Sequence, residues 1–191
     1  MQKIRYKPKG YKVKPRGREK VRHLAHGFSD VIREVMGVSS VALPVVDVIE
    51  FLDYRGVLEL DVVEAADLGY EAAAETIPGR GDDPPLMRIE NGVFERAVEG
   101  GNFERFTIAH ELGHFFMHMD EPIVFARGVP DHRPFEDSEW QANAFAGELL
   151  VDSRIVVAEG YTTEFEICRQ LGVSSETAAI QWAELKKNGI V

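Results

Sequence analysis

The fold of this chain is decided by the stretch His110-Glu111-Leu112-Gly113-His114. On a helix, two histidines four residues apart lie one above the other on one face, so both imidazoles can reach the same metal ion. Glu111 then lies beside the open coordination position, where it can take a proton from a bound water. The stretch therefore predicts a catalytic metal centre with two histidine ligands and Glu111 as general base.

Apolar residues surround this motif on nearly every side of the predicted helix. Residues 103–109 lead into it and residues 115–118 lead out of it, a pattern typical of a helix buried in a domain core. Asn102 is the expected N-cap, because it follows two glycines. The alternative is a pair of core histidines satisfied by hydrogen bonds. Two buried histidines with a glutamate between them would need several partners at once, which favours the metal.

A catalytic zinc ion has three protein ligands and keeps a fourth position for water. His118 is excluded as the third ligand, because it follows His110 by eight residues, or about 12 Å along one helix. Zinc–ligand distances are only about 2 Å. The extended zincin pattern has a third histidine six residues after the second, where this chain has Asp120. The third ligand must therefore come from another element.

Residues 138–150 are expected to form a second helix, because their apolar residues recur at helical spacing. Glu139, in its first turn, is our candidate for the third ligand, and Asn143, one turn later, could support a ligand. Spacing alone leaves Glu136 and Glu148 open as alternatives. We expect one Zn2+ ion per chain, although manganese or iron also suits these donors.

Two stretches of the chain resemble the ImmA/IrrE family of bacterial and phage metallopeptidases. In that family an R-F-T-x-A-H-E-x-G-H helix precedes an E-x-x-A-N-x-F-A helix whose first glutamate is the third metal ligand. Residues 105–114 and 139–150 carry these patterns, and the resemblance covers roughly residues 86–152. It departs at Val151-Asp152, where family members tend to have Met-Pro. The resemblance implies His110, His114 and Glu139 as metal ligands and Glu111 as the general base.

The resemblance also implies a function. It indicates a zinc-dependent endopeptidase that makes a specific regulatory cut in a protein substrate, typically a helix-turn-helix transcriptional repressor. The alternative is a non-catalytic, metal-stabilised regulator that binds a repressor or DNA. Glu111 counts against this alternative, because a scaffold has no chemical need for it. Four residues stay unranked as candidates for stabilising the oxyanion: His118, Arg127, His132 and Tyr161.

Charge is distributed unevenly along the chain. Residues 1–22 contain ten of the 22 basic residues and one of the 32 acidic residues. Spaced cations with interleaved prolines and glycines predict an extended basic arm. A solvated tail, or a strap lying on the acidic body of the same chain, is favoured over contact with nucleic acid.

Composition favours one compact domain with appendages, because the chain has 191 residues and 45% hydrophobic content. No apolar run approaches eighteen residues and the basic start lacks an apolar core, so neither a membrane span nor a secretion signal is expected. The lone Cys168 cannot form an internal disulfide, which suits the reducing cytoplasm.

We expect an α+β fold in three parts. Residues 1–20 form a basic, flexible arm, and residues 21–155 form a small zincin-like metallopeptidase domain with the motif helix packed beside a short sheet. Residues 156–191 form a helix-turn-helix-like segment. Helices are predicted over residues 23–36 and 44–52, and strands over residues 57–63, 71–77 and 86–89, with the first two strands paired. An edge strand of such a sheet can bind an extended peptide.

The helix-turn-helix-like segment has a defined turn. Gly172 is expected to end its first helix and Ser174 to cap its second. In a DNA-binding arrangement, the residues facing a groove would be Ser175, Glu176, Ala179 and Gln181. This face includes an acid, and the chain has no Lys or Arg until Lys186. Packing on the catalytic domain, or docking of a protein partner, is therefore favoured.

Overall fold

The computed structural model describes residues 7–69, 72–119 and 132–191, so Asp120 and Arg127 lie outside the described residues. In chain order its elements are α1 (Arg18–Met36), α2 (Val45–Tyr54), β1 (Glu59–Val63), α3 (Ala65–Leu68), β2 (Ala74–Ile77), β3 (Leu86–Glu90), α4 (Asn91–Val98), α5 (Asn102–His118), the 3-10 turn η1 (Pro134–Glu136), α6 (Ser138–Leu150), α7 (Ser153–Ala158), α8 (Glu164–Leu171) and α9 (Ser175–Lys187). The fold is rich in helix with a small sheet, in agreement with the predicted α+β class.

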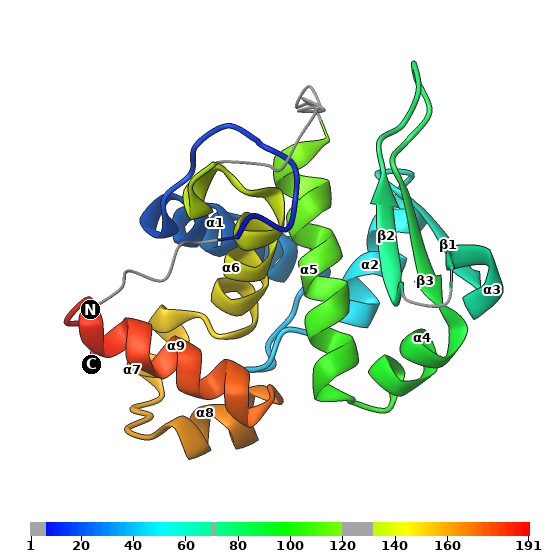
Figure 1. Cartoon of the computed structure of the whole chain (residues 1–191). Helices are drawn as coiled ribbons and strands as arrows, with labels where there is room; N and C mark the ends of the chain where they lie inside the picture. Colours follow the sequence, from blue (N-terminus) through cyan, green and yellow to red (C-terminus); the bar gives the residue numbers. More distant parts are fainter. Residues whose placement is uncertain (1–6, 70–71, 120–131) are drawn as a thin grey trace.

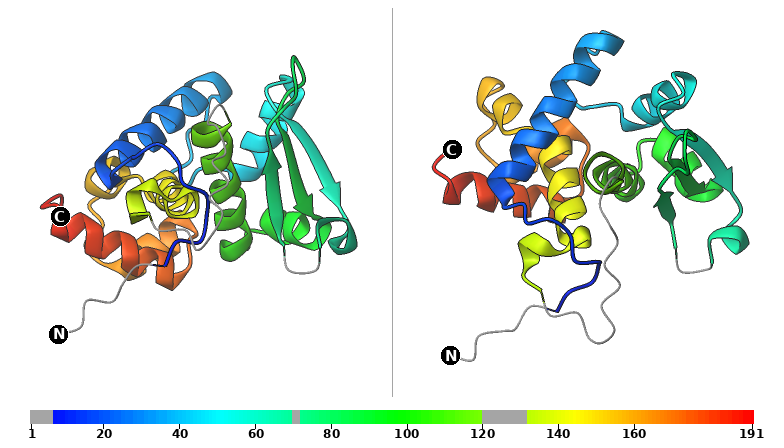
Figure 2. Two further views of the ribbon diagram at one scale, coloured as in Figure 1. Left: turned by 45° about the horizontal axis from the view of Figure 1, so that its top comes forward. Right: turned by 90° about the horizontal axis from the view of Figure 1, so that it is seen from above.

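Helix α5 carries the His-Glu motif and lies in the middle of the molecule (Figure 1). The sheet, with α2, α3 and α4, lies on one side of α5 (Figures 1 and 2). Helices α1 and α6 and the C-terminal helices α7 to α9 lie on the other side. Because α5 contributes to the core on both sides, Ile108, Ala109 and Leu112 are completely buried.

The sheet has the strand order β1-β3-β2. Strand β1 pairs with β3 in parallel, and β2 pairs with β3 in antiparallel orientation. The predicted pairing of the first two strands is therefore wrong, because β3 lies between them. Met87 and Ile89 of β3 are fully buried, whereas β1 and β2 are mostly exposed or half-buried, so β3 takes the central place. Strand β2 is the edge strand nearest α5.

Most predicted helix ends are confirmed. Helix α1 ends at Gly37, whose φ of 67° is the left-handed conformation that glycine adopts without strain. Gly172 (φ 59°) ends α8, and the Ser174 side chain caps α9. The N-cap of α5 is Gly101, so the predicted cap at Asn102 is off by one residue. Among the described residues, no helix combines the length and hydropathy needed to cross a bilayer.

The basic arm lies on the body of the protein. Its residues 9–16, here called the strap, run in extended form along residues 135–138. The Val13 amide donates to the Glu136 carbonyl at 2.8 Å, and the Arg16 amide donates to the Phe135 carbonyl at 2.8 Å. In Figure 1 this segment, coloured dark blue, passes over α6. The strap is thus attached beside the first turn of α6, the turn that carries Glu139.

Asp137 joins the strap to α6 and is fully buried. One carboxylate oxygen accepts from the amides of Glu139 and Trp140 at 2.9 and 3.1 Å, which caps α6. The other accepts from the Lys9 amide at 2.8 Å. It also lies 3.0 Å from His132 Nε2. Burial raises the pKa of Asp137, but these backbone and histidine hydrogen bonds outweigh burial, so the net pKa is lowered.

Glu148 anchors α6 to α1. Its side chain is only 1% exposed and lies between two arginines of α1. Arg18 Nε donates to one carboxylate oxygen at 2.9 Å, and Arg22 Nε donates to the other at 2.8 Å. A buried carboxylate with both oxygens in charge-assisted hydrogen bonds is satisfied where it is. Part of the positive charge near the N-terminus therefore neutralises a buried acid.

Helices α5 and α6 approach each other closely at Gly113. A Cβ at this position would lie 3.1 Å from Ala142 Cα, 3.2 Å from the Ala142 carbonyl oxygen and 3.3 Å from Phe145 Cβ. These neighbours are the backbone of α6 and the base of one of its core side chains. A side chain at position 113 would therefore move one helix away from the other.

We expect Gly113→Ala to lower the free energy of unfolding by about 1–3 kcal/mol, because the added methyl overpacks the contact between α5 and α6. Gly27→Ala is the matched control, because Gly27 lies within α1 and its Cβ would meet no atom within 4 Å. Gly27→Ala should instead raise the free energy of unfolding by about 0.5–1 kcal/mol, because alanine forms helices better than glycine does. Urea denaturation measures both. Equal stabilisation by the two variants would contradict the close approach.

We expect Asp137→Asn to lower the free energy of unfolding at pH 7 by about 1–3 kcal/mol, because an amide cannot accept all the hydrogen bonds that reach the carboxylate. The pKa of Asp137 is lower in the folded protein than in the unfolded chain, where it is near 3.9. The Asp137 carboxylate therefore stabilises the fold fully above the unfolded pKa, and this stabilisation is lost as the pH falls through the folded pKa. The free energies of unfolding of Asp137→Asn and wild type should therefore become more similar below about pH 4. Urea denaturation across this pH range measures it.

The exposed Asp82 supplies the control for this pH series. Asp82→Asn should leave the free energy of unfolding within about 0.5 kcal/mol of wild type. A gap between Asp137→Asn and wild type that stays constant down to pH 2 would show that the Asp137 carboxylate is not the group responsible.

Candidate metal centre

Three polar side chains from two helices converge at the contact between α5 and α6. His110 and His114 come from α5, and Glu139 comes from the first turn of α6. The Nε2 atoms of the two histidines are 3.0 Å apart. Glu139 Oε2 lies 3.3 Å from His110 Nε2, and Glu139 Oε1 lies 3.2 Å from His114 Nε2. The three predicted ligand side chains therefore form a compact triangle, in which each carboxylate oxygen of Glu139 faces one histidine.

The triangle has the size that a single metal ion requires. Ligand atoms about 2.0–2.2 Å from a common centre, at tetrahedral angles, are separated by about 3.3–3.5 Å. Two imidazole nitrogens and a carboxylate oxygen are also a donor set that divalent transition metals accept. The Glu139 side chain is 34% exposed, and those of both histidines are 16% exposed, so one side of the triangle is open to solvent. Residues, spacing and access all fit a catalytic metal ion.

The charges within the cluster match this use. Hydrogen bonds with the two histidines hold the pKa of Glu139 far below its usual range, so it is a carboxylate at neutral pH. Burial lowers the pKa of His110, but the Glu139 hydrogen bond and the charges of Glu111 and Glu139 outweigh it and raise the pKa overall. A negatively charged donor is thus held against the imidazoles, which favours binding of a cation.

Glu111 lies beside the cluster and is 7% exposed. Its Oε2 accepts a hydrogen bond of 2.7 Å from the hydroxyl of Thr76, on edge strand β2. The general base predicted from the sequence therefore has a defined orientation, and the sheet provides it. Sequence reasoning missed Thr76, because a single threonine on a strand forms no recognisable pattern.

The other predicted candidates have defined places too. Glu136 receives the Arg133 amide at 3.0 Å, and Glu148 is held by the α1 arginines, so neither belongs to the cluster. His132 is bound to Asp137, and the Tyr161 amide donates to the Val156 carbonyl at the end of α7. Among the described residues, we assign no side chain to the oxyanion.

Each histidine of the cluster has a partner on its far nitrogen. His110 Nδ1 lies 3.2 Å from Asn143 Oδ1 of α6, so Asn143 is placed as the sequence predicted. His114 Nδ1 lies 3.1 Å from His118 Nδ1. Metal-binding histidines normally have such a partner, which fixes the ring orientation and the tautomer. His118 is therefore next to a ligand position without being part of the triangle.

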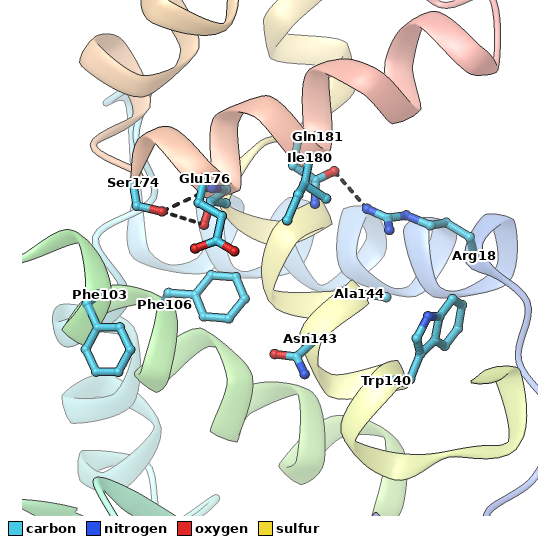
Figure 3. Close-up of a pocket in the computed structure, with 11 residues that line it drawn as sticks. Arg18, Phe103, Phe106, Trp140, Asn143, Ala144, Ser174, Glu176, Ile180 and Gln181 are labelled. Atoms are coloured by element: carbon cyan, nitrogen blue, oxygen red, sulfur yellow. Dashed lines mark hydrogen bonds between the residues drawn. The ribbon is translucent and has the colours of Figure 1, made fainter. Parts of the chain in front are cut away.

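A cleft of about 330 Å3 opens beside the cluster, between α5, α6 and the first half of α9 (Figure 3). Phe103, Phe106, Trp140 and Ile180 give it an apolar lining. Asn143 belongs both to the cleft and to the partners of His110, so the two features are contiguous. Figure 3 shows Glu176 of α9 facing Phe106 of α5 across this cleft.

We expect Glu139→Ala to weaken zinc binding by more than the about 10–100-fold that loss of an outer partner costs, because a direct ligand is removed. Glu136→Ala is the matched control, since Glu136 lies three residues earlier and outside the triangle. Elemental analysis after dialysis, followed by chelator competition, measures both variants. Equal zinc content in Glu139→Ala and wild type would exclude Glu139 as a ligand.

Comparison with known families agrees with this geometry. Residues 102–182 match the model of the IrrE N-terminal-like domain, Peptidase_M78. The matched region begins with α5 and includes the whole of α6, and hence all three residues of the triangle. No curated protein and no solved structure matches the chain. The match supports a metallopeptidase-like, metal-dependent protein with the fold that the family implies. The match over residues 102–182 supports an ImmA/IrrE family member, in agreement with the resemblance in the sequence.

Proposed function

We propose that this protein is a zinc-dependent endopeptidase that makes a specific regulatory cut in a protein substrate. The observation that carries the proposal is the triangle of His110, His114 and Glu139, open on one side, with the Glu111 carboxylate beside it. Zinc is the default ion for two imidazoles and one carboxylate that leave a coordination position free.

The chemistry divides among a few side chains. His110, His114 and Glu139 would hold the zinc ion. A bound zinc ion supplies Lewis-acid chemistry, lowering the pKa of a water molecule and polarising the scissile carbonyl. Glu111 takes the proton of the attacking water and later delivers it to the leaving amine. Thr76 donates a hydrogen bond to one oxygen of Glu111, which fixes the position of the other oxygen, the one available to act as the base.

The surroundings of the cluster suit an extended peptide. Strand β2 is an edge strand, and its Thr76 contacts Glu111, so a peptide that paired with β2 would pass directly over the base. The apolar cleft between α5 and α9 offers space for a substrate side chain next to His110. Cleavage within a chain, as opposed to trimming of its ends, is what the family resemblance implies.

The substrate class follows from kinship with the family. A helix-turn-helix transcriptional repressor, cut once in the cytoplasm, is the protein partner that the resemblance implies. The shape of the cleft beside the metal site agrees with a selective enzyme. Three helices line this cleft and would restrict which side chains can enter it.

The alternative, a non-catalytic regulator that binds DNA or a repressor, is less well supported. Lys12 of the strap pairs with Glu136 at 3.5 Å, and Arg18 pairs with the buried Glu148. Arg105 of α5 donates to the carbonyls of Leu43 and Leu171, each at 3.1 Å, which holds the α8–α9 turn against the body. Lys12 and Arg18 of the arm are therefore paired with acids of the protein itself, and the start of α9 lies next to the α8–α9 turn that Arg105 holds.

Glu111→Gln tests the proposed mechanism. The amide cannot accept the water proton, so cleavage should fall by about 10²–10⁴-fold while zinc content and thermal unfolding stay unchanged. The assay would follow digestion of denatured casein and of candidate repressors by the zinc-loaded protein, with cleavage sites read by mass spectrometry. Glu104→Gln is the control, because Glu104 is on the same helix but pairs with Arg96. Cleavage retained in Glu111→Gln would exclude this glutamate as the base.

A further inference from the structure

The partner of His114 is unusual, because it is a second imidazole. A carboxylate, a carbonyl or a water usually accepts the far N–H of a metal-binding histidine, and each of these can act as an acceptor. An imidazole nitrogen can donate or accept, depending on which ring nitrogen carries the hydrogen. His114 Nδ1 and His118 Nδ1 lie 3.1 Å apart, and a further group must decide which of these two nitrogens donates the hydrogen bond.

Gln141 of α6 is that group. Its side chain is fully buried, and its Nε2 donates to two backbone carbonyls, those of Lys14 and Phe135, each at 2.8 Å. Its Oε1 then faces Arg16 Nη1 at 3.1 Å and His118 Nε2 at 3.1 Å. The reverse amide orientation would set the NH2 group against a guanidinium and the oxygen against two carbonyls. The orientation of Gln141 is therefore fixed by its neighbours.

The direction of the remaining contacts follows. A carbonyl oxygen only accepts, so His118 Nε2 carries a hydrogen and donates to Gln141. A neutral His118 then has its lone pair on Nδ1, which accepts from the Nδ1–H of His114. The Nε2 atom of His114 is left with its lone pair directed at the triangle, as a metal ligand requires.

The strap contacts both ends of the Gln141 amide group. Lys14 offers a carbonyl to Gln141, and Arg16 donates to Gln141 and also to the Met117 carbonyl at 3.1 Å. The strap passes so close to the first turn of α6 that a Cβ at Gly10 would collide with Ser138 and with Glu139. A segment some 125 residues earlier in the chain than Gln141 thus holds the residue that directs His118.

We propose that His118 is a positioning residue for His114, and that the strap, acting through Gln141, fixes the tautomer of His118 so that it accepts a hydrogen bond from the ligand. The inference rests on the proposed metal site. It gives the basic arm a role within the catalytic domain, and it predicts that the metal affinity depends on His118 although His118 does not bind the ion.

The first test reads the tautomer in full-length wild-type protein, with and without zinc. Long-range 1H–15N correlation spectra at about pH 8, above the ordinary histidine pKa of about 6.5, show which ring nitrogens carry hydrogen. His118 should carry its hydrogen on Nε2 and leave Nδ1 bare, and His114 should carry its hydrogen on Nδ1. A hydrogen on His118 Nδ1 would overturn the proposal. This readout involves no variant and no catalysis.

The second test compares two substitutions of His118. His118→Leu removes the acceptor while filling a similar space, and His118→Asn offers a carbonyl oxygen near the former Nδ1. Competition with a chromophoric chelator, with zinc alone as the probe, should show affinity about 10–100-fold weaker for His118→Leu. His118→Asn should stay within about threefold of wild type. Circular dichroism melting of both variants reports on folding.

The outcomes separate this proposal from the metal site itself. Wild-type protein that takes up no zinc would remove the proposed function, whatever His118 does. Wild type and His118→Leu with equal zinc affinity would leave the metal site standing and overturn the positioning role. Equal weakening in His118→Leu and His118→Asn, with both folded, would show that the ring acts by packing and would also overturn it.

Discussion

A close contact between α5 and α6 governs the geometry of the candidate site. Gly113 and Ala142 bring α5 and α6 so close together that a Cβ at position 113 would press against the backbone of α6. His114 is the next residue along α5, and Glu139 is less than one turn before Ala142 on α6. The distance between the helix axes therefore determines the distance between the candidate ligands His114 and Glu139. A glycine within the motif, which has no part in the chemistry, sets the dimensions of the triangle.

Around this contact the protein replaces water with its own polar groups. Asp137, Gln141 and Glu148 are all buried on α6 or at its N-cap, and each is hydrogen-bonded to the N-terminal part of the chain. Buried polar groups of this kind are costly if a partner is missing, so they hold α6 in one position. The segregation of charge in the sequence has a structural reason, since the basic arm and the acidic body are partners for each other.

The two site helices and the proximity of His110 and His114 could be predicted from the sequence, because helical spacing brings the two histidines together by local geometry alone. Glu139 could not be separated from Glu136 and Glu148 by spacing. Their environments distinguish them, since Glu148 is held by α1 arginines and Glu136 by the Arg133 amide, both outside the reach of local rules. The family resemblance singles out Glu139, which helical spacing alone does not. The three-part domain division stays a prediction.

Other features depended on contacts distant in sequence. The strand pairing was misassigned because the central place of β3 follows from core packing. Helix α4 was missed, since its N-cap is Glu90, a residue type rarely used as a cap, with its carboxylate accepting from the Gly92 and Val93 amides at 2.9 Å. The strap and the partners of Gln141 join segments more than a hundred residues apart, and no local pattern reports such contacts.

The strap also sets the order in which the site can be assembled during synthesis. Lys9 emerges from the ribosome early, but its partner Asp137 is 128 residues later. At about 5–20 residues per second, the arm waits on the order of 10 s before the segment it binds has been made. The nascent chain thus displays the two histidines of α5 before Glu139 and the groups that orient His114 exist. The candidate metal centre is therefore completed only after α6 has been made.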